Sequence, residues 1–256
     1  MSGHSKWKNI MHKKEKTDAQ RAKIFTKIGK EIAIAVREGG PDPVSNGKLR
    51  DLIAKAKANN VPNDNIERTL KKASGEDGTV YEEVTYEGYG PSGVAVIVET
   101  ATDNRNRTAS DVRHYFDKYG GNLGTNGCVS YMFQGRGLIV VGREIEPDEK
   151  APRGTKPTPV NEDELMEAAL EAGATDFVAD EECFEISTEE NDLTFVRETL
   201  ESKGYPIVSA DRDMVPSSYV TLSDETDIKN MTLLLEMLED NDDVSEVWHN
   251  WDSGEE

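Results

Sequence analysis

Cysteine is scarce in this chain of 256 residues, which has only Cys128 and Cys183. Two cysteines are too few for a disulfide framework or a zinc knuckle, and both stand in strand-like runs where a thiol acts as a small hydrophobe. Long apolar runs are absent too, since no stretch approaches the ~18 apolar residues that a membrane span needs. The N-terminal segment lacks the apolar region of a secretory signal. We therefore expect a cytoplasmic protein in a reducing compartment, with no membrane contact.

Signature motifs of common enzymes are also missing. The chain has no G-x-S-x-G elbow, no Walker loop and no H-E-x-x-H motif. Gly88, Gly90 and Gly93 spell a literal G-x-G-x-x-G, but a Val-rich strand follows them where a dinucleotide site needs a helix. His4 and His12 have no Cys or acidic partner at a metal-binding spacing. We therefore expect no enzymatic activity, no cofactor and no metal.

The charge that is present is spread unevenly. The chain has 30 Lys and Arg and 50 Asp and Glu; residues 1–72 hold 17 and 8 of them, a net of +9, which leaves −29 beyond. Such asymmetry is typical of a polyanion-binding part attached to a body that polyanions repel. The alternative is a solvated basic surface without a partner. Interleaved aromatic and histidine residues favour an interaction segment, so we expect a nucleic acid as partner.

Three short amphipathic helices are predicted in the basic part. The first starts at a capping box formed by Thr17 and Gln20 and stops at residues 39–41. The other two are predicted at about 46–58 and 63–73. On the first helix, cations lie opposite the apolar stripe and are expected to face outward: Lys23, Lys27, Lys30 and Arg37.

Residues 1–16 have no sustained apolar repeat and are expected to form an arm along a phosphate backbone. Trp7 could stack on a base or anchor the arm to the bundle, and both remain open. Lys71 and Lys72 also have a simpler explanation, because cations in a last helical turn favour the helix dipole. The candidate nucleic-acid-binding residues are His4, Lys6, Trp7, Lys8, Lys13, Lys14, Lys16, Arg21, Lys23, Lys27, Lys30, Lys71 and Lys72.

From Tyr81 onward the pattern alternates between strands and helices. Two strands joined by a Gly/Pro turn are predicted first, then a helix at about 106–119 and a strand in CVSYMF. The following segment has the order βαββαβ, which indicates a ferredoxin-like unit. A last βαβ fragment is too small for a core of its own, and we expect it to complete the earlier sheet.

The predicted fold is therefore α+β and multidomain. It has an N-terminal three-helix bundle plus two ferredoxin-like α/β domains, the third domain inserted in the second. The basic helical domain covers 1–75, the discontinuous α/β domain covers 76–134 with 215–256, and the inserted domain covers 135–214.

Five ordered motifs carry a family resemblance: GHSKWKNI with DAQRAKIFTKIGKEI, KAKANNVPNDNIERTLKKASG, YEGYGPSGVAVIVE, TDNRNRTASDVRHYFDKYGGNLG, and VSYMF. Over essentially its whole length the chain resembles the YebC/PmpR family, whose mitochondrial relatives are translational activators of cytochrome c oxidase. The resemblance implies a helical N-terminal domain, two α/β domains in a crescent and no enzymatic activity. The family's basic residues map onto Lys6, Lys8, Lys13, Lys14, Arg21, Lys23 and Lys27. Its other strong motifs include residues of unassigned role, for which turn formation is the simpler explanation: Tyr86, Gly88, Tyr89, Gly90, Pro91, Asn104, Arg105 and Asn106.

The resemblance leaves the regulated process open. Family members are labelled DNA-binding transcriptional regulators, whereas the mitochondrial relatives, and bacterial ones linked to proline-rich stalls, point to the ribosome. Lysines bind a backbone without reading bases, and no duplicated recognition helix or dimer seam is evident, so we favour a monomer that binds ribosomal RNA. The alternative is a regulator that binds promoter DNA, for which Asn65 and Arg68 give weak support. A third hypothesis is a scaffold whose acidic domains bind a basic ribosomal protein.

Overall fold

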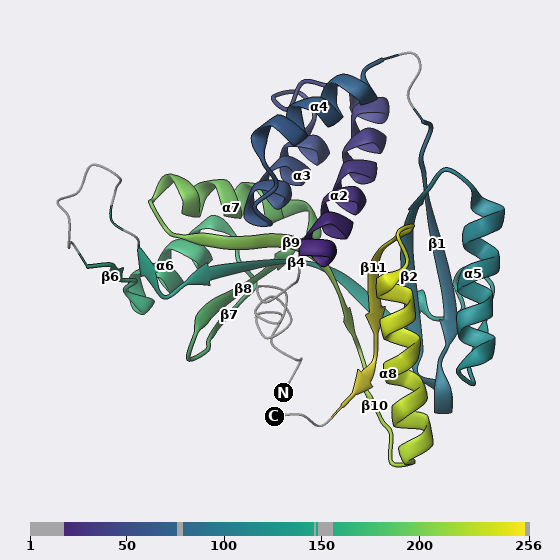
Figure 1. Cartoon of the computed structure of the whole chain (residues 1–256). Coiled ribbons are helices and arrows are strands. Elements are labelled where there is room, and N and C mark those ends of the chain that lie inside the picture. The colour runs from purple at the N-terminus through teal and green to yellow at the C-terminus, as the bar shows by residue number, and fades with distance from the viewer. Residues whose placement is uncertain (1–17, 76–78, 146, 148–155, 254–256) are drawn as a thin grey trace. The chain divides into compact units, whose positions relative to one another are not determined.

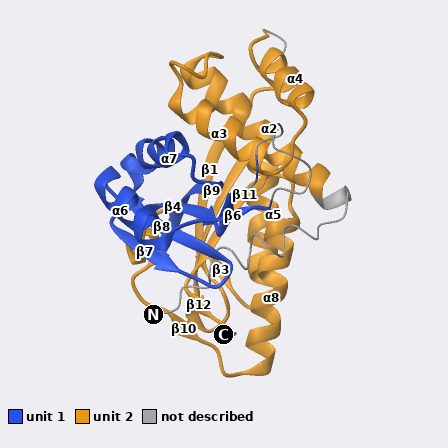
Figure 2. Cartoon of the chain, turned by 90° about the vertical axis from the view of Figure 1, so that its left-hand side faces the viewer, with its two compact units in different colours: residues 1–14, 135–215 blue, residues 15–134, 216–256 orange. Residues whose placement is uncertain are grey.

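The computed structural model describes residues 18–75, 79–145, 147 and 156–253 (Figure 1). The described chain divides into two compact units, which Figure 2 shows in different colours. Unit 1 takes the described residues from 135 to 215, and unit 2 takes those from 18 to 134 and from 216 to 253. The protein is α+β, with a helical N-terminal part followed by sheets covered by helices.

Unit 2 begins with a bundle of three helices: α2 Asp18–Gly39, α3 Gly47–Ala58 and α4 Asn63–Ala73. Apolar side chains at helical spacing are buried between them, among them Ile28, Ile32, Leu49 and Ile66. Burial of these faces, more than helix propensity, stabilises helices this short. The predicted three-helix bundle is confirmed.

Asn46 ties the start of α3 to the end of α2. Its side-chain oxygen accepts a hydrogen bond from the Leu49 backbone N–H, as an N-cap does. Its side-chain nitrogen donates to the carbonyls of Ala35 and Gly40 at 2.8 and 2.9 Å. Because both polar ends of this buried amide are satisfied, the turn between the two helices is well defined.

The sheet of unit 2 has the strand order β11-β2-β1-β3. Its members are β1 Glu82–Tyr89, β2 Ala95–Thr102, β3 Asn122–Leu123 and β11 Val244–His249. β11 pairs antiparallel with β2, with Trp248 opposite Ile97. Segments that precede and follow unit 1 in the sequence therefore contribute strands to the same sheet.

Two helices cover one face of this sheet: α5 Arg105–Lys118 and α8 Glu225–Asp240. Val96 and Val98 of β2 pack there against Phe116 of α5 and Leu234 of α8. A short parallel pair, β10 Val220–Thr221 and β12 Trp251–Asp252, lies beside the end of the chain.

The predicted strand in CVSYMF is wrong. Cys128 lies in a turn, Ser130–Met132 form a 3₁₀ turn, and the third strand of the sheet is β3 instead. The physical reason is Glu87, whose carboxylate accepts hydrogen bonds from backbone N–H groups in the segment and folds it back on itself. The sheet is built from the order ββαβαβ, so the ferredoxin-like prediction is also wrong for this part of the chain.

Unit 1 follows the predicted order βαββαβ. The main elements are β4 Phe133–Gly142, α6 Glu162–Ala172, β7 Asp176–Ala179, β8 Cys183–Glu189, α7 Leu193–Ser202 and β9 Ile207–Pro216. The strand order in the sheet is β7-β8-β4-β9. Helices α6 and α7 pack on one face of the sheet, where Leu165, Phe184 and Leu200 are buried. A small antiparallel pair, β5 Glu144–Ile145 and β6 Thr158–Pro159, follows β4.

Candidate nucleic-acid interface

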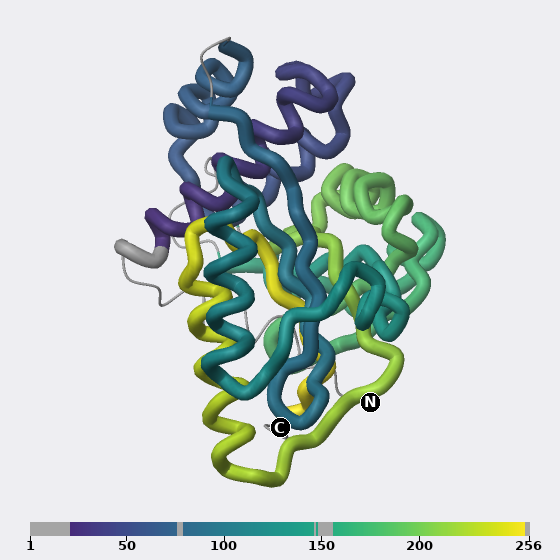
Figure 3. The backbone as a smooth tube through the Cα atoms, turned by 90° about the vertical axis from the view of Figure 1, so that its right-hand side faces the viewer, coloured from purple at the N-terminus to yellow at the C-terminus, as the bar shows by residue number. Residues whose placement is uncertain are grey.

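Three lysines on α2 face an acidic turn of the same unit. We call Lys23, Lys27 and Lys30 the α2 lysine row. We call residues 239–243 (EDNDD), which are the last two residues of α8 and the three that lead to β11, the acidic turn. Figure 3 shows α2, in purple, passing over this end of α8, in yellow. The row therefore faces the turn instead of open solvent, contrary to the outward orientation expected from the helical pattern.

Each lysine of the α2 lysine row has an acceptor in the acidic turn. Lys23 pairs with the Asp240 carboxylate, Lys27 donates to the Glu239 carbonyl at 2.5 Å, and Lys30 donates to the Asp242 carbonyl at 2.9 Å. The last carbonyls of a helix have no partner within the helix, and the negative end of its dipole attracts cations. The hydrogen bond to Asp240 raises the pKa of Lys23.

Asp243 forms the buried end of this contact, with 6% of its side chain exposed. Its carboxylate accepts hydrogen bonds from Lys30 at 2.6 Å, Arg107 at 2.6 Å and the Thr108 hydroxyl at 2.9 Å. Burial alone would raise the pKa of Asp243, but these hydrogen bonds together outweigh it and lower the pKa to about 2. One ionised carboxylate therefore joins α2, α5 and the acidic turn.

A second ionic cluster joins the bundle to β11. Lys55 of α3 pairs with Glu246 of β11 at 3.0 Å and with Glu31 of α2 at 3.5 Å. Burial raises the pKa of Glu31, against the opposing effect of Lys55. This lysine therefore offsets the repulsion between two neighbouring carboxylates.

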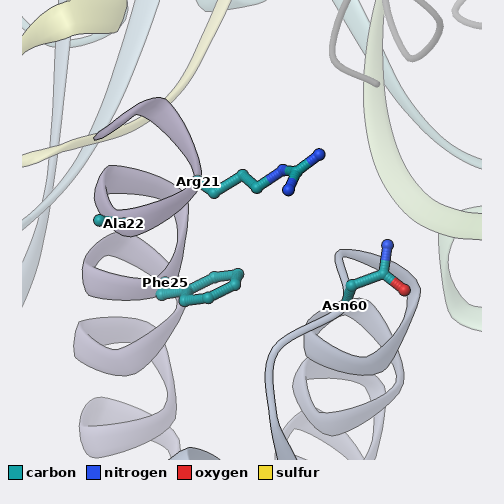
Figure 4. Close-up of a pocket in the computed structure, with 4 residues that line it drawn as sticks. All are labelled: Arg21, Ala22, Phe25 and Asn60. Carbon is teal, nitrogen blue, oxygen red and sulfur yellow. The ribbon is translucent and has the colours of Figure 1, made fainter. Parts of the chain in front are cut away.

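A hollow lies between α2 and the loop that follows α3 (Figure 4). The described residues that line it are Arg21, Ala22, Phe25 and Asn60. Phe25 is only half-buried, whereas Ile28, three residues on, is 3% exposed. Asn60 has the left-handed backbone angle φ 57°. An aromatic face, a guanidinium and an amide are groups with which proteins contact unstacked bases and phosphates.

The end of α4 carries a group of exposed cations, Arg68, Lys71 and Lys72, which we call the α4 cation group. Spacings of three and four residues put them on one face of the helix. In the part of the chain that the structure describes, none of the three side chains forms a hydrogen bond or an ion pair. The α4 cation group is therefore open to an external polyanion.

The described candidates thus fall in three places: Arg21 at the hollow, the α2 lysine row against the acidic turn, and Lys71 and Lys72 on α4. The other candidates lie outside the described residues: His4, Lys6, Trp7, Lys8, Lys13, Lys14 and Lys16. Arg37, expected to face outward, is exposed.

Gly88 of the YEGYGPSG motif and Gly121 of the KYGGNLG segment allow a close approach of two strands. A Cβ added at Gly88 would lie 2.6 Å from the Asn122 carbonyl oxygen, and one added at Gly121 would lie 2.5 Å from that of Tyr89. Neither contact is sterically tolerable, so β1 and β3 can pair as they do only with glycine at both positions. The Tyr89 hydroxyl donates to the Cys128 carbonyl at 3.0 Å.

Other residues of the family motifs also make local structural contacts. Pro91 begins a 3₁₀ turn directly after Gly90, and the Tyr86 hydroxyl donates to the Arg105 carbonyl at 3.4 Å. Asn104 caps α5 by accepting a hydrogen bond from the Arg107 backbone N–H at 3.1 Å. Arg105 lies 3.7 Å from Glu82, and Asn106 is exposed. These contacts support turn formation and capping as the role of the motifs.

Sequence reasoning missed two carboxylates that organise unit 2, Glu87 and Asp243. Burial would raise the pKa of Glu87, but hydrogen bonds from the backbone N–H groups of Gly127, Val129 and Ser130 lower it. An acid at an inward position of an alternating strand is the signal that could have found Glu87. For Asp243 the signal is the run of acids directly after an amphipathic helix.

The hollow was missed as well. Phe25 fits the apolar repeat of the first helix, which predicts an inward side chain, and Asn60 belongs to no motif that indicates a site. The Asn-Asn pair at 59–60, placed between two predicted helices, is a signal for a left-handed turn that can present an amide.

Other kinds of site find little support in the described residues. No three His, Cys, Asp or Glu side chains among them are grouped so as to hold a metal ion. None of the described helices has the length and apolar character needed to cross a membrane. Fold and surface define a class of α+β protein in which a three-helix N-terminal part presents cations and is followed along the chain by acidic segments of strands and helices.

Comparison with known proteins identifies the family within this class. The family model described as the TACO1/YebC protein N-terminal domain matches residues 5–76. The model described as the TACO1/YebC second and third domain matches residues 81–251. Together they span most of the chain, and the chain belongs to the TACO1/YebC family.

Individual relatives agree with this assignment. A protein of Acetivibrio thermocellus is 60% identical over 98% of this chain and 99% of its own length, and one of Ruminiclostridium cellulolyticum is 59% identical over 100% and 98%. Both are named probable transcriptional regulatory protein, a name for a regulator and not for an enzyme. The crystal structure of a conserved hypothetical protein from Aquifex aeolicus is similar with a TM-score of 0.79, at 46% identity over 94% of both chains.

Proposed function

We propose that this protein is a nucleic-acid-binding regulator of gene expression without enzymatic activity, and that its helical part holds the nucleic acid. The observation that carries the proposal is the α4 cation group, three exposed cations on one helix face. Cations placed in this way neutralise phosphates and release counterions, which gives affinity without sequence readout. The acidic remainder of the chain would repel a polyanion, so contact is confined to the bundle and the basic residues before it.

Transcription is the process that we propose first, with DNA as the polymer. The names of the relatives support this choice over the ribosomal RNA that the sequence analysis favoured. Asn63 and Asn65, at the start of α4, share that helix with Arg68. Side chains of these types can reach base edges in the major groove, which lysines alone do not read.

A ribosome-associated translation factor that helps stalled, proline-rich synthesis is the second candidate. The hollow beside Phe25 favours it, because a half-exposed aromatic next to a guanidinium and an amide suits a splayed-out base of single-stranded RNA. The acidic units would then face basic ribosomal proteins.

We also propose the finer organisation that the sequence analysis predicts. Residues 1–75 form the nucleic-acid-binding domain, 76–134 with 215–256 form one α/β domain, and 135–214 form an inserted domain. The strand order β7-β8-β4-β9 supports a ferredoxin-like assignment for the inserted domain. A cytoplasmic monomer remains our expectation.

Crosslinking in growing cells, followed by sequencing of bound DNA and bound RNA, tests the function. The wild type is expected to give sharp promoter peaks. The variant Lys71→Glu with Lys72→Glu should lose them, because two cations of the α4 cation group become like-charged with phosphate. A matched control, Lys118→Glu with Lys229→Glu, makes the same change of charge at exposed positions on α5 and α8 and should keep the peaks.

The result separates the two candidates. Enrichment of ribosomal RNA in place of promoters, lost in the same α4 variant, would replace transcription by the translation candidate. Equal signals from the α4 variant and its control would contradict the assignment of the helical part as the binding surface.

A further inference from the structure

The acidic turn occupies the lysines that a phosphate backbone would otherwise use. It supplies carboxylate or carbonyl oxygens to all three residues of the α2 lysine row, at hydrogen-bond distance. A nucleic acid would present its phosphate oxygens to the same amino groups. Lys23 and Lys30 each already donate to two oxygens of the turn, and its carboxylates repel an incoming phosphate, so the turn and a nucleic acid compete for these amino groups.

The acidic turn is held in shape independently of the lysines. The Asn241 side-chain oxygen accepts a hydrogen bond from the Asp243 backbone N–H at 2.8 Å, and its nitrogen donates to the Tyr115 hydroxyl at 3.2 Å. The carboxylate of Asp243 is also fixed by Arg107 and Thr108 of α5. The turn is therefore a preorganised acceptor that requires little ordering when α2 docks on it.

The ion pairs between the α2 lysine row and the acidic turn differ in solvent exposure, from an exposed pair at one end to a buried pair at the other. At the exposed end, 40% of the Lys23 side chain and 69% of the Asp240 side chain are open to solvent. At the buried end the corresponding values for Lys30 and Asp243 are 12% and 6%. Exposed ion pairs contribute little and exchange readily, whereas breaking a buried pair leaves an uncompensated charge.

We propose that the acidic turn competes with nucleic acid for Lys23 and Lys27, so that the free protein keeps part of its cationic surface covered. This inference rests on the proposed function. A polyanion that first meets the α4 cation group displaces Asp240 from Lys23 and takes up Lys27, while the buried pair of Lys30 and Asp243 keeps the bundle attached. Weak or short polyanions fail to displace the turn, which makes the contact an autoinhibitory filter.

Neutralising the exposed acids of the turn should strengthen binding. The variant is Asp240→Asn with Asp242→Asn, which leaves Asp243 and the backbone carbonyls in place. The control is Asp117→Asn with Glu225→Gln, which makes the same change of net charge at exposed positions. Those positions lie on the last turn of α5 and the first turn of α8, so the control leaves the turn intact.

Fluorescence anisotropy with a labelled DNA duplex and a labelled single-stranded RNA measures the effect in the full chain. The turn variant should bind about three- to tenfold tighter than the control, since the exposed Lys23–Asp240 pair and the attraction of Asp242 for Lys23, both of which it removes, are modest competitors. In the absence of nucleic acid, amine acylation followed by mass spectrometry should show Lys23 more reactive in the turn variant than in the wild type. Exposed Lys57 serves as the internal standard.

Equal affinity of the turn variant and the control, with clear binding by the wild type, would overturn the inference and leave the proposed function standing. Unchanged acylation of Lys23 would also contradict the shielding. If neither the wild type nor any variant binds either polymer, the proposed function fails and the inference fails with it.

Discussion

The helical part of the molecule holds two groups of cations in opposite surroundings. Every lysine of the α2 lysine row has an acceptor in the acidic turn, and Lys30 is nearly buried. The α4 cation group, on the same bundle, is exposed to solvent. Both groups belong to one basic segment of the sequence, yet one serves docking within the molecule and the other is free for a partner.

Whether a cation pairs within the molecule or stays exposed depends on the element that packs beside its helix. α2 lies against the end of α8, where unpaired carbonyls and a run of acids attract lysines. The cations of α4 form no ion pair with a described acid and are exposed. Net charge therefore predicts that a polyanion binds the segment, but it does not predict which cations take part.

Removing the buried carboxylate of Asp243 should weaken the contact between the α2 lysine row and the acidic turn. Asp243→Ala leaves Lys30 almost buried without its partner, and loss of one member of a buried ion pair costs about 3–5 kcal/mol. We expect a free energy of unfolding lower by about 3 kcal/mol in chemical denaturation. Lys30→Met and the double variant complete a cycle that isolates the coupling between the two side chains. Additive effects of the two single changes would contradict the pairing.

Low pH should weaken the contact between the α2 lysine row and the acidic turn, over a pH range set by the titration of Asp243. The folded protein lowers the pKa of Asp243 from its ordinary 3.8 to about 2, so its stabilising contribution is fully present above about pH 4. That contribution is lost as the pH falls from about 4 toward 2, because the unfolded chain then binds the proton more readily. The difference in stability between the wild type and Asp243→Asn should therefore narrow across this range.

Unfolding by urea at a series of pH values measures this change. Other carboxylates titrate alike in both proteins and cancel in the difference. If the difference in free energy of unfolding between the wild type and Asp243→Asn stays constant from pH 6 to pH 2, the Asp243 carboxylate is not held ionised by its partners.

Reversing the charge of two residues in the α4 cation group should weaken nucleic-acid binding and leave folding unaffected. Lys71→Glu with Lys72→Glu prevents the neutralisation of up to two phosphates, so affinity for duplex DNA should fall by about tenfold or more at physiological salt. The slope of log affinity against log salt should become shallower by as much as ~1.8, because each neutralised phosphate contributes ~0.9 to it. Anisotropy over a salt series gives both values. The same slope as in Lys118→Glu with Lys229→Glu would remove α4 from the interface.

Much of the fold is predictable because local signals agree with the final packing. α3 and α4 fall at 47–58 and 63–73, close to the predicted 46–58 and 63–73, since apolar spacing and caps mark both. The pairing of β11 with β2 could also be predicted, because the last βαβ fragment cannot bury a core alone. These features follow from the periodicity and the size of each segment.

Features that depend on distant partners were not predictable. The segment around Cys128 has the composition of a strand, but three hydrogen bonds to Glu87 bend it into a turn. The α2 lysine row looks solvated on a helical wheel, which contains no information about the end of α8, more than 200 residues along the chain. A wheel separates apolar from polar faces, and it cannot tell a polar face in water from one against a partner.

The smallest expected effect on stability concerns the exposed ion pair between Lys23 and Asp240. Asp240→Asn alone removes the carboxylate that pairs with Lys23, but both side chains are open to water, and such pairs commonly contribute nothing measurable to stability. The thermal midpoint should match that of the wild type within error, while Asp243→Ala lowers it clearly. The pKa of Lys23, raised by Asp240, should fall toward its ordinary value, which NMR of the labelled side chain can follow. A loss of stability as large as that of Asp243→Ala would mean that docking depends on the whole acidic turn and not on its buried end.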